Sequence, residues 1–317
     1  MHTSVNSTLR LALGCMGLTG TWNPAEMDAG RERRSIDAFG AALDAGITLY
    51  DHADIYGGGT CEEVFRKCLA AFPDARSRIQ IWTKGGIRPG HYDLSAPYLA
   101  ECIERSRTRM GIDAIDLYQL HRPDPFTHPA ETAKALNAAL KAGHIGAVGV
   151  SNYFPEQTRA LQKYLDAPVV SNQFLINALR LAPFYEGWEM EKPGSDAAET
   201  PPGMGVVGDG TLDFCMAEGI VPLAYSPLAK AVLSRGDADE PRLRAVQDAL
   251  GEIAEARGAT RTQITIAWLL AHPSGIVPIV GSANPAHIAE AARAVDFPLD
   301  RLEWYRVFSA APRRRVP

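Results

Sequence analysis

Four side chains able to move a proton lie at the ends of three short apolar segments. Asp51 and Tyr56 follow the first segment, Lys84 the second and His121 the third. They supply a carboxylate, a phenol, an ammonium and an imidazole. If the fold brings the three segment ends to one edge, these groups form a proton-transfer site.

The chemistry expected of this set is protonation of a carbonyl oxygen. A free tyrosine phenol has a pKa of about 10, too high for efficient proton transfer near neutrality. A nearby Lys84 ammonium would favour the phenolate and lower the pKa of Tyr56, while Asp51 would keep the ammonium charged and in place. A neutral His121 would orient the oxygen, and Tyr56 would protonate it as a hydride reaches the carbon.

Each of these residues also has a purely structural interpretation. An Asp at a strand end often caps a loop, a Lys there is usually solvated, and a lone His or Tyr often simply packs. The structural interpretation weakens because all four groups occur at successive segment ends. We therefore favour the functional interpretation.

The elements that must position these groups alternate along the chain. Short apolar runs predict strands at 11–16, 48–51, 79–83, 115–120, 147–150, 169–172, 221–224 and 276–280. Amphipathic patterns predict helices at 33–45, 61–71, 96–110, 130–142, 155–165, 212–218, 242–257 and 285–295. Gly46, Gly111, Gly143, Gly219 and Gly258 are predicted to end helices in the left-handed conformation.

Eight strand–helix units indicate a parallel sheet, because parallel strands need helical crossovers. An open doubly wound sheet is possible, but the number of units and the length favour a (β/α)8 (TIM) barrel. Two insertions exceed a minimal barrel: an irregular loop at 190–210 and an extra helix at 261–271. No low-complexity segment divides the chain, so we predict one domain over 1–317.

Composition excludes several classes of protein. The chain has 317 residues, 46% hydrophobic and 22% charged, with a formal net charge of −5, which is typical of a soluble globular protein and unlike a nucleic-acid-binding surface. Five cysteines without a CxxC pair, and the lack of a signal-peptide or membrane-spanning run, predict a reduced cytoplasmic protein. No metal-ligand spacing and no GxGxxG after the first strand are present, so we predict neither a metal site nor a Rossmann fold.

Taken together, these motifs resemble the aldo-keto reductase family. The resemblance rests on the runs 46–57, 81–84, 117–124, 149–152, 172–173, 224–228 and 278–282. Asp-His-Ala-Asp-Ile-Tyr-Gly-Gly combined with His-Arg-Pro-Asp is most similar to the bacterial YdhF-type oxidoreductases. The resemblance implies a barrel with a nicotinamide dinucleotide extended across its rim. It also implies Tyr56 as general acid, supported by Lys84, Asp51 and His121.

The resemblance further implies a set of cofactor-binding residues. Ser151, Asn152 and Gln173 would hold the nicotinamide carboxamide, for which amide side chains offer both a donor and an acceptor. Tyr225 would stack on the nicotinamide ring. The remaining positions are Gly17, Leu18 and Asp51, the pyrophosphate loop Ser226, Pro227, Leu228, Ala229 and Lys230, and the adenosine end Gly281, Ser282, Asn284, His287 and Glu290.

Two positions at the adenosine end depart from the family pattern. Many relatives have a basic residue at the position of Gly281 and an arginine at that of His287, where they meet the 2′-phosphate of NADP. A histidine is largely neutral at pH 7, so the charge that discriminates NADP is reduced, although Lys230 can contribute. We predict NADP(H), with weaker discrimination against NAD(H). His52 replaces a common threonine and points away from Asp51 by strand alternation, so we predict that it is packed.

The favoured function is therefore reduction of a small-molecule carbonyl compound with NADPH, without a nucleic-acid or membrane partner. One alternative is a nicotinamide-binding regulatory subunit of the channel β-subunit type, with 190–210 as a candidate partner segment. Another is a lyase or isomerase on the same barrel that uses no nicotinamide. Trp22 is a candidate wall of the substrate pocket, or it can equally pack on the outside of the barrel. The aromatic residues Phe184, Tyr185 and Trp188 can either line the pocket or anchor the long loop.

Overall fold

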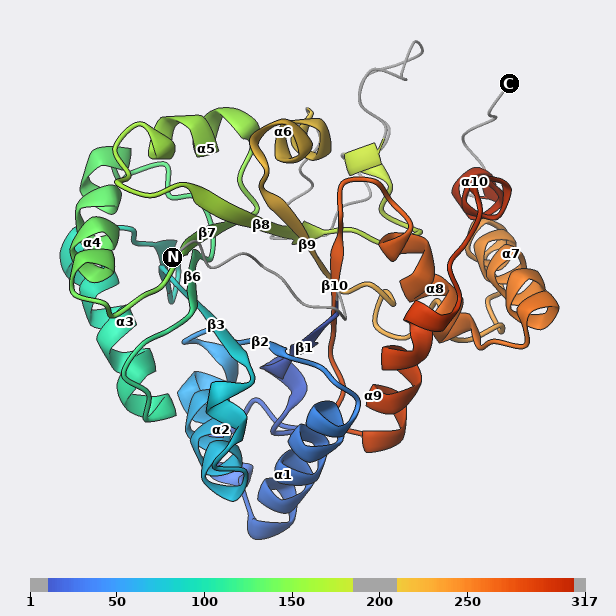
Figure 1. Ribbon diagram of the computed structural model, residues 1–317, viewed down its shortest axis with the longest axis horizontal. Coiled ribbons are helices and arrows are strands. Elements are labelled where there is room, and N and C mark those ends of the chain that lie inside the picture. The colour runs from blue at the N-terminus through green and yellow to red at the C-terminus, as the bar shows by residue number, and fades with distance from the viewer. Residues whose placement is uncertain (1–10, 185–209, 311–317) are drawn as a thin grey trace.

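The computed structural model describes residues 11–184 and 210–310, and its strands close into a barrel (Figure 1). The order around the barrel is β1, β2, β3, β6, β7, β8, β9 and β10, and every neighbouring pair is parallel. The barrel strands are β1 (Ala12–Gly14), β2 (Leu49–Asp51), β3 (Gln80–Gly85), β6 (Leu117–Leu120), β7 (Val148–Ser151), β8 (Val169–Leu175), β9 (Val221–Tyr225) and β10 (Val277–Val280). The predicted (β/α)8 barrel is confirmed.

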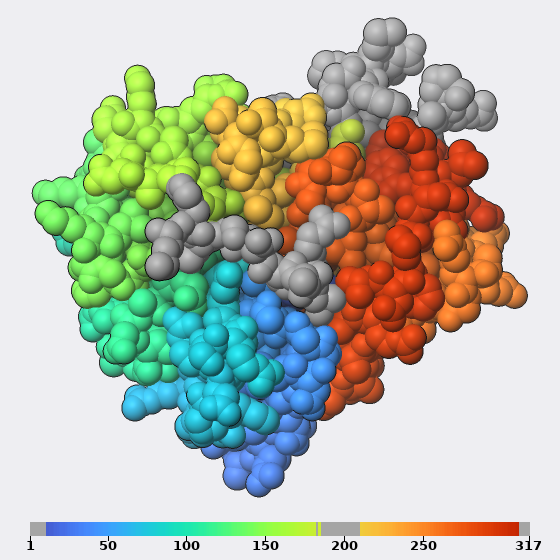
Figure 2. All heavy atoms as spheres, viewed as in Figure 1, coloured from blue at the N-terminus to red at the C-terminus, as the bar shows by residue number. Residues whose placement is uncertain are grey.

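Helices surround this barrel, and the first and last units of the chain meet where α1 packs against α9 (Figure 1, Figure 2). The helices are α1 (Ala29–Asp44), α2 (Thr60–Ala71), α3 (Ala96–Met110), α4 (Pro129–Lys141), α5 (Pro155–Gln162), α6 (Thr211–Glu218), α7 (Pro241–Arg257), α8 (Arg261–Leu270), α9 (Pro285–Ala292) and α10 (Arg301–Ala310). The extra helix predicted at 261–271 is α8. All five glycines predicted to end helices have positive φ angles, between 61° and 77°. None of these helices is long and apolar enough to cross a membrane.

Several boundaries and two elements differ from the sequence-based prediction. The first strand stops at Gly14 because Cys15–Gly17 form a 3-10 turn, and β8 runs on to Leu175 because it pairs with β9 that far. The hairpin of β4 (Ile87–Arg88) and β5 (His91–Tyr92) was not predicted, since two-residue strands are too short to show a period. The loop predicted at 190–210 lies outside the described residues, apart from its last position.

Helix α10 was also not predicted, although its start carries a readable signal. Glu303 N–H donates to the Asp300 carboxylate at 2.9 Å, and Asp300 N–H donates to the Glu303 carboxylate at 2.9 Å. This reciprocal arrangement is a capping box, in which two backbone donors are satisfied by side chains three residues apart. An acidic residue at each of these two positions was therefore the sign of a helix start.

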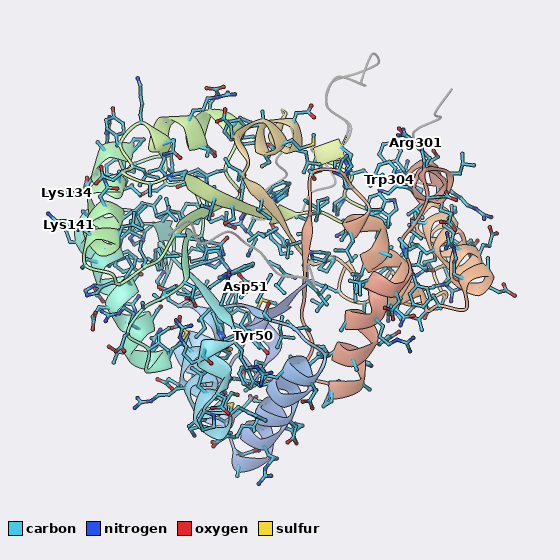
Figure 3. The ribbon with its side chains drawn as sticks, in the orientation of Figure 1. Tyr50, Asp51, Lys134, Lys141, Arg301 and Trp304 are labelled. Carbon is cyan, nitrogen blue, oxygen red and sulfur yellow. The ribbon has the colours of Figure 1, made fainter. Side chains whose placement is uncertain are left out.

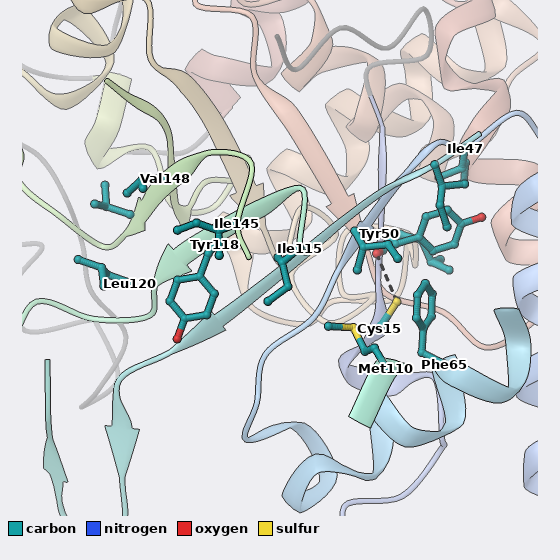
Figure 4. Packing of buried hydrophobic residues seen from close by; sticks show 14 of the residues in the cluster. Cys15, Ile47, Tyr50, Phe65, Met110, Ile115, Tyr118, Leu120, Ile145 and Val148 are labelled. Atoms are coloured by element: carbon teal, nitrogen blue, oxygen red, sulfur yellow. Dashed lines mark hydrogen bonds between the residues drawn. The ribbon is translucent and has the colours of Figure 1, made fainter. Parts of the chain in front are cut away.

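The hydrophobic core has separate parts outside and inside the barrel. Between the sheet and α1 to α4, large side chains such as Tyr50, Phe65 and Tyr118 pack together (Figure 4). Inside the barrel, apolar side chains form a separate cluster of Ala12, Leu49, Trp82, Leu117, Ala147, Leu223, Val277 and Ile279. Successive inward positions on a strand are two residues apart. The next inward residues after Leu49, Trp82 and Leu117 are therefore Asp51, Lys84 and Gln119, which form a polar layer on top of an apolar floor.

Candidate active site

An ion pair lies in this polar layer, between the ends of β2 and β3. The ammonium Nζ of Lys84 donates to both carboxylate oxygens of Asp51, at 2.7 and 2.8 Å, and to the backbone oxygen of His52 at 2.7 Å. Both charged side chains are buried, and Figure 3 shows Asp51 inside the ring of helices. Burial lowers the pKa of Lys84, and the Asp51 carboxylate opposes this. The three donors of the ammonium are all used.

Two amide side chains also contact the Asp51 carboxylate. Gln173 Nε2 donates to Asp51 Oδ1 at 2.8 Å, and Gln119 Nε2 approaches the same oxygen at 3.4 Å. Gln173 is one of the cofactor-binding residues that the family resemblance implies, but Gln119 was not singled out. The signal for Gln119 was a polar residue at an inward position of a strand whose preceding inward residue, Leu117, is apolar. Both amides therefore help to hold the Asp51 carboxylate in place.

The phenol of Tyr56 and the imidazole of His121 lie next to this pair. Their ring centroids are 6.1 Å apart in an edge-to-face arrangement, and Lys84 Nζ is 5.3 Å from the centroid of the Tyr56 ring. The structure thus brings together all four residues predicted as the proton-transfer set. Trp22, after β1, stands edge-on to Tyr56 with a centroid distance of 6.2 Å and is 57% exposed. It therefore lies beside the phenol while remaining largely exposed.

The predicted effect of Lys84 on Tyr56 is wrong. The pKa of Tyr56 is raised well above 10, first by burial and then by the negative charge of Asp51. The physical reason is that all three N–H groups of the Lys84 ammonium donate to Asp51 and to the His52 backbone oxygen. The negative charge of Asp51 also balances the positive charge of Lys84. The phenol is consequently held in its protonated form, and it can give up the proton only to an oxygen that has become strongly basic.

Burial, together with the charges of Lys84 and Arg122, lowers the pKa of His121 well below its ordinary value of 6.5. The imidazole is therefore neutral throughout the physiological pH range. A neutral ring carries one N–H donor, which suits it to orient a carbonyl oxygen beside Tyr56. Arg122, the next residue, also acts on Tyr225: burial raises the pKa of that phenol, while the guanidinium lowers it by charge and hydrogen bonding.

The residues predicted to hold a carboxamide form a connected hydrogen-bond network at the ends of β7, β8 and β9. Ser151 Oγ donates to the Gln173 backbone oxygen at 2.9 Å and accepts from Asn152 Nδ2 at 2.8 Å. The Tyr225 hydroxyl donates to Asn152 Oδ1 at 3.1 Å. Asn152 has a left-handed φ of 60°, a conformation that asparagine tolerates better than most residues. The network thus fixes the amide groups and the Tyr225 ring relative to one another.

The predicted pyrophosphate loop has an unusual backbone. Ser226, Ala229, Lys230 and Ala231 all have positive φ angles, between 47° and 65°. Non-glycine residues in this region carry strain, which persists only where the surroundings impose it. Within the described part of the chain, no acceptor is recorded for the N–H groups of Lys230 and Ala231. Successive backbone N–H groups in such a turn form a concave site suited to an anion.

The predicted adenosine end lies around the start of α9. Ser282 and Asn284 cap the helix: Ser282 Oγ accepts from Asn284 N–H at 3.1 Å, and Asn284 Oδ1 accepts from Ala286 N–H at 3.0 Å. Gly281 and His287 are exposed and Glu290 is half-buried. After the neighbouring strand β1, Gly17 is exposed. Leu18 instead packs into the hydrophobic core, where its N–H donates to the Cys15 backbone oxygen and its C=O accepts from Ser35 Oγ.

Two residues considered in the sequence analysis have structural roles. Phe184 contacts Trp268, His272, Trp304 and Phe308 in an aromatic cluster beneath α10, so it anchors the start of the long loop and does not line the site. Tyr185 and Trp188 lie outside the described residues. His52 is fully buried with its ring edge-on to Phe65 at 4.4 Å, which confirms that it is packed.

The buried position of His52 predicts a loss of stability in acid. Burial lowers its pKa from 6.5 to about 3. Between these values the unfolded chain binds a proton that the folded protein does not, so stability is present above pH 6.5 and is lost as the pH falls. We expect His52 to make the free energy of unfolding fall by about 1.4 kcal/mol per pH unit in this window.

The measurement is urea unfolding between pH 7 and pH 4 for the wild type and for His52→Leu. Other titrating groups contribute equally to both proteins, so the difference between the two slopes isolates His52. Parallel pH dependences in the two proteins would contradict the prediction.

Comparison with known proteins places the chain in a family. A family model described as the Aldo/keto reductase family matches residues 10–311. The 6-dehydroglucose reductase of Novosphingobium aromaticivorans is 40% identical over 284 residues, which cover 87% of this chain and 85% of that protein. The oxidoreductase YdhF of Escherichia coli is 31% identical over 284 residues, covering 87% and 86%.

Solved structures agree with this placement. The thermostable aldo-keto reductase Tm1743, in complex with the inhibitor epalrestat, has a TM-score of 0.77 and 28% identity, covering 95% of this chain and 94% of that one. An aldo-keto reductase from Klebsiella pneumoniae in complex with NADPH has a TM-score of 0.73 and 25% identity, covering 97% and 93%. The family model and these relatives place the closed barrel among the oxidoreductases. The chain belongs to the aldo/keto reductase family and is an enzyme.

Proposed function

We propose that the protein reduces an aldehyde or ketone to an alcohol with NADPH, with Tyr56 as the general acid. The observation that carries this proposal is the arrangement of a protonated phenol and a neutral imidazole over the Asp51–Lys84 ion pair. The rings of Tyr56 and His121 are 6.1 Å apart, so one carbonyl oxygen can lie between them.

A bound nicotinamide cofactor would supply a hydride for the carbonyl carbon. His121 holds the carbonyl oxygen in place through its neutral ring, and Tyr56 gives that oxygen a proton as negative charge develops on it. Because the pKa of Tyr56 is raised, the phenol keeps its proton until the oxygen has become strongly basic. The Asp51–Lys84 pair holds β2 and β3 together beneath the phenol.

The residues of this chain fit a nicotinamide dinucleotide. Asn152 and Gln173 supply amide groups for a carboxamide, and the Tyr225 ring is fixed beside them. The N–H groups of Lys230 and Ala231 supply donors for a pyrophosphate, and the start of α9 adds the positive end of a helix dipole. The family, and the NADPH complex of the Klebsiella pneumoniae relative, support NADP(H) as the cofactor.

The substrate class is suggested by two relatives that bear the same name. Proteins from Novosphingobium aromaticivorans and Agrobacterium fabrum, 40% and 34% identical, are both called 6-dehydroglucose reductase. We infer that a hydroxylated aldehyde of the sugar class is the first substrate to test. Arg122, half-buried beside His121, offers donors for such hydroxyl groups.

The test is to incubate the protein with NADPH and, in turn, each of a panel of sugar aldehydes, simple aldehydes and diketones. Turnover is measured as the loss of reduced-nicotinamide absorbance. Turnover that disappears in Tyr56→Phe supports the proposal. Tight NADPH binding without turnover on any compound favours the regulatory-subunit alternative, whose candidate segment 190–210 lies outside the described residues except Gly210. A cofactor fluorescence titration that shows no binding favours a lyase or isomerase instead.

We expect the protein to bind NADPH more tightly than NADH, by a modest factor. Gly281 carries no charge and the exposed His287 is an imidazole, so no arginine meets a 2′-phosphate there. We expect a lower Kd for NADPH than for NADH, and we expect His287→Arg to widen the ratio by about fivefold, typical of one exposed ion pair. Fluorescence titration of both cofactors measures this.

His144→Arg is the matched control, because residue 144 precedes β7 at the other end of the barrel. Added salt should reduce the gain of His287→Arg, since exposed ion pairs are screened. An equal or lower Kd for NADH in the wild type would refute the preference.

A further inference from the structure

The loop between β2 and α2 carries Tyr56 on a backbone with little side-chain support. Tyr56 is followed by Gly57, Gly58 and Gly59, whose φ angles are 56°, 65° and 104°. Glycine reaches this left-handed region without strain, but it also loses the most conformational freedom on ordering and offers no side chain to pack. The position of the phenol therefore depends on whatever holds the backbone of this loop.

A single guanidinium group holds the loop on both sides of Tyr56. Arg109 on α3 donates from Nη1 to the Asp54 backbone oxygen at 2.9 Å, and its Nη2 lies 3.5 Å from the Gly58 backbone oxygen. These two carbonyls are two residues before and two residues after Tyr56. The guanidinium also rests against Gly59, where a Cβ atom would come within 2.3 Å of Arg109 Cζ. The absence of a side chain at Gly59 thus makes room for the arginine.

One buried acidic side chain contacts the arginine in turn. Arg109 Nη1 lies 3.4 Å from Glu62 Oε2, and Glu62 Oε1 accepts from Thr83 Oγ1 at 2.8 Å. Thr83 immediately precedes Lys84 on β3. One turn earlier on α3, Arg105 donates to Asp54 Oδ2 at 3.0 Å. The chain of contacts therefore connects the strand that carries the lysine to the loop that carries the phenol.

The carboxylates in this network are desolvated, which makes their pairing important. Glu62 and Asp54 are almost fully buried. Burial raises the pKa of both carboxyl groups, and the Arg109 guanidinium opposes the rise in each case. Removing one partner of such a pair leaves an uncompensated buried charge, which is strongly unfavourable. The arginine is thus held in one geometry.

We propose that Arg109 is a positioning residue for the proton-transfer step, and that its bridge between the Asp54 and Gly58 carbonyls sets where the Tyr56 phenol lies relative to His121. The inference rests on the proposed role of Tyr56 as the acid. A guanidinium presents five N–H donors in a fixed planar fork, so it can bind two carbonyls and a carboxylate at once. An ammonium is a point charge and cannot reproduce that fork.

The test is Arg109→Lys, which keeps a positive charge for Glu62 but loses the bridge. We expect kcat to fall by about tenfold, because sub-ångström misplacement of a reacting group has effects of this size. The hydrogen isotope effect on kcat with C4-deuterated NADPH should rise, because a slower chemical step limits turnover more. The Kd for NADPH and the unfolding midpoint should stay close to those of the wild type.

Arg107→Lys is the matched control on the same helix. Arg107 donates to the Asp113 backbone oxygen and to Glu104, away from the Tyr56 loop, so kcat and the isotope effect should not change. If Arg109→Lys does not fold, Glu62→Gln decides the question. It keeps the side-chain shape, weakens the hold on the arginine, and should give a smaller change in the same direction.

Wild-type kcat and isotope effect in a folded Arg109→Lys protein would overturn the proposal. So would a loss of NADPH affinity as large as the loss in kcat, because the arginine would then act on cofactor binding. Tyr56→Phe separates these outcomes from failure of the proposed function. If that variant keeps wild-type turnover, the acid assignment is wrong. If it is inactive while Arg109→Lys is fully active, only the present inference fails.

Discussion

Tyr56→Phe is expected to lower kcat by about 10²–10⁴-fold, the range typical of losing a general acid. The variant removes one oxygen from a buried ring and leaves the ring packing intact. The Kd for NADPH should not change, because the amide network that fits the carboxamide involves Asn152, Gln173 and Tyr225 and no atom of Tyr56. Steady-state kinetics and a fluorescence titration of the cofactor measure the two effects separately.

Tyr164→Phe is the control for this prediction. Tyr164 follows α5, is exposed, and contacts only the ring of His128 among the aromatic residues described. Its loss should leave kcat and the Kd unaltered. A Tyr56→Phe protein that turns over at the wild-type rate would show that another group delivers the proton.

Lys84→Met is expected to destabilise the fold as well as abolish turnover. The substitution leaves the Asp51 carboxylate buried without its cation, and breaking a buried pair from one side costs about 3–5 kcal/mol. The double variant Asp51→Asn/Lys84→Met should recover much of this loss, since no lone charge remains, while staying inactive. Urea unfolding gives the stabilities, and the NADPH assay gives the activities.

The exposed pair of Lys67 with Glu32 provides the comparison. Lys67→Met should change the free energy of unfolding by less than about 1 kcal/mol, because exposed ion pairs contribute little. If Lys84→Met lowered the free energy of unfolding no more than Lys67→Met does, the predicted cost of breaking the buried Asp51–Lys84 pair would be wrong. If the double variant regained turnover, the pair would have no part in the chemistry.

Much of the fold was readable from the sequence because it depends on local periodicity. Alternating apolar runs and amphipathic stretches predicted all eight barrel strands, and helix-ending glycines marked five boundaries with correct backbone conformation. The misses, β4–β5 and α10, are a hairpin too short to show a period and a helix whose capping box was overlooked. Strand ends shifted because the length of a strand depends on how far its neighbour extends, as for β8 beside β9.

The sequence indicated which residues lie together in the candidate site, but it did not predict their protonation states. The order of motifs pointed to Asp51, Tyr56, Lys84 and His121, and the closed barrel brings them together. The expected lowering of the pKa of Tyr56 by Lys84 was wrong, because it assumed an ammonium with a free donor facing the phenol. In the structure the donors of Lys84 are taken by Asp51 and His52, and burial dominates.

By itself, the sequence determined the family, the alternation of elements and the residue types at the strand ends, because these are encoded within short stretches of chain. Only the tertiary structure decided which groups are desolvated and which distant side chains meet. Gln119 reaches Asp51 across 68 positions, and Arg109 reaches the Tyr56 loop from α3 across more than 50. Such contacts form only when the barrel closes and the helices pack, so no local sequence pattern predicts them. They set the protonation state and the position of the side chains in the candidate active site.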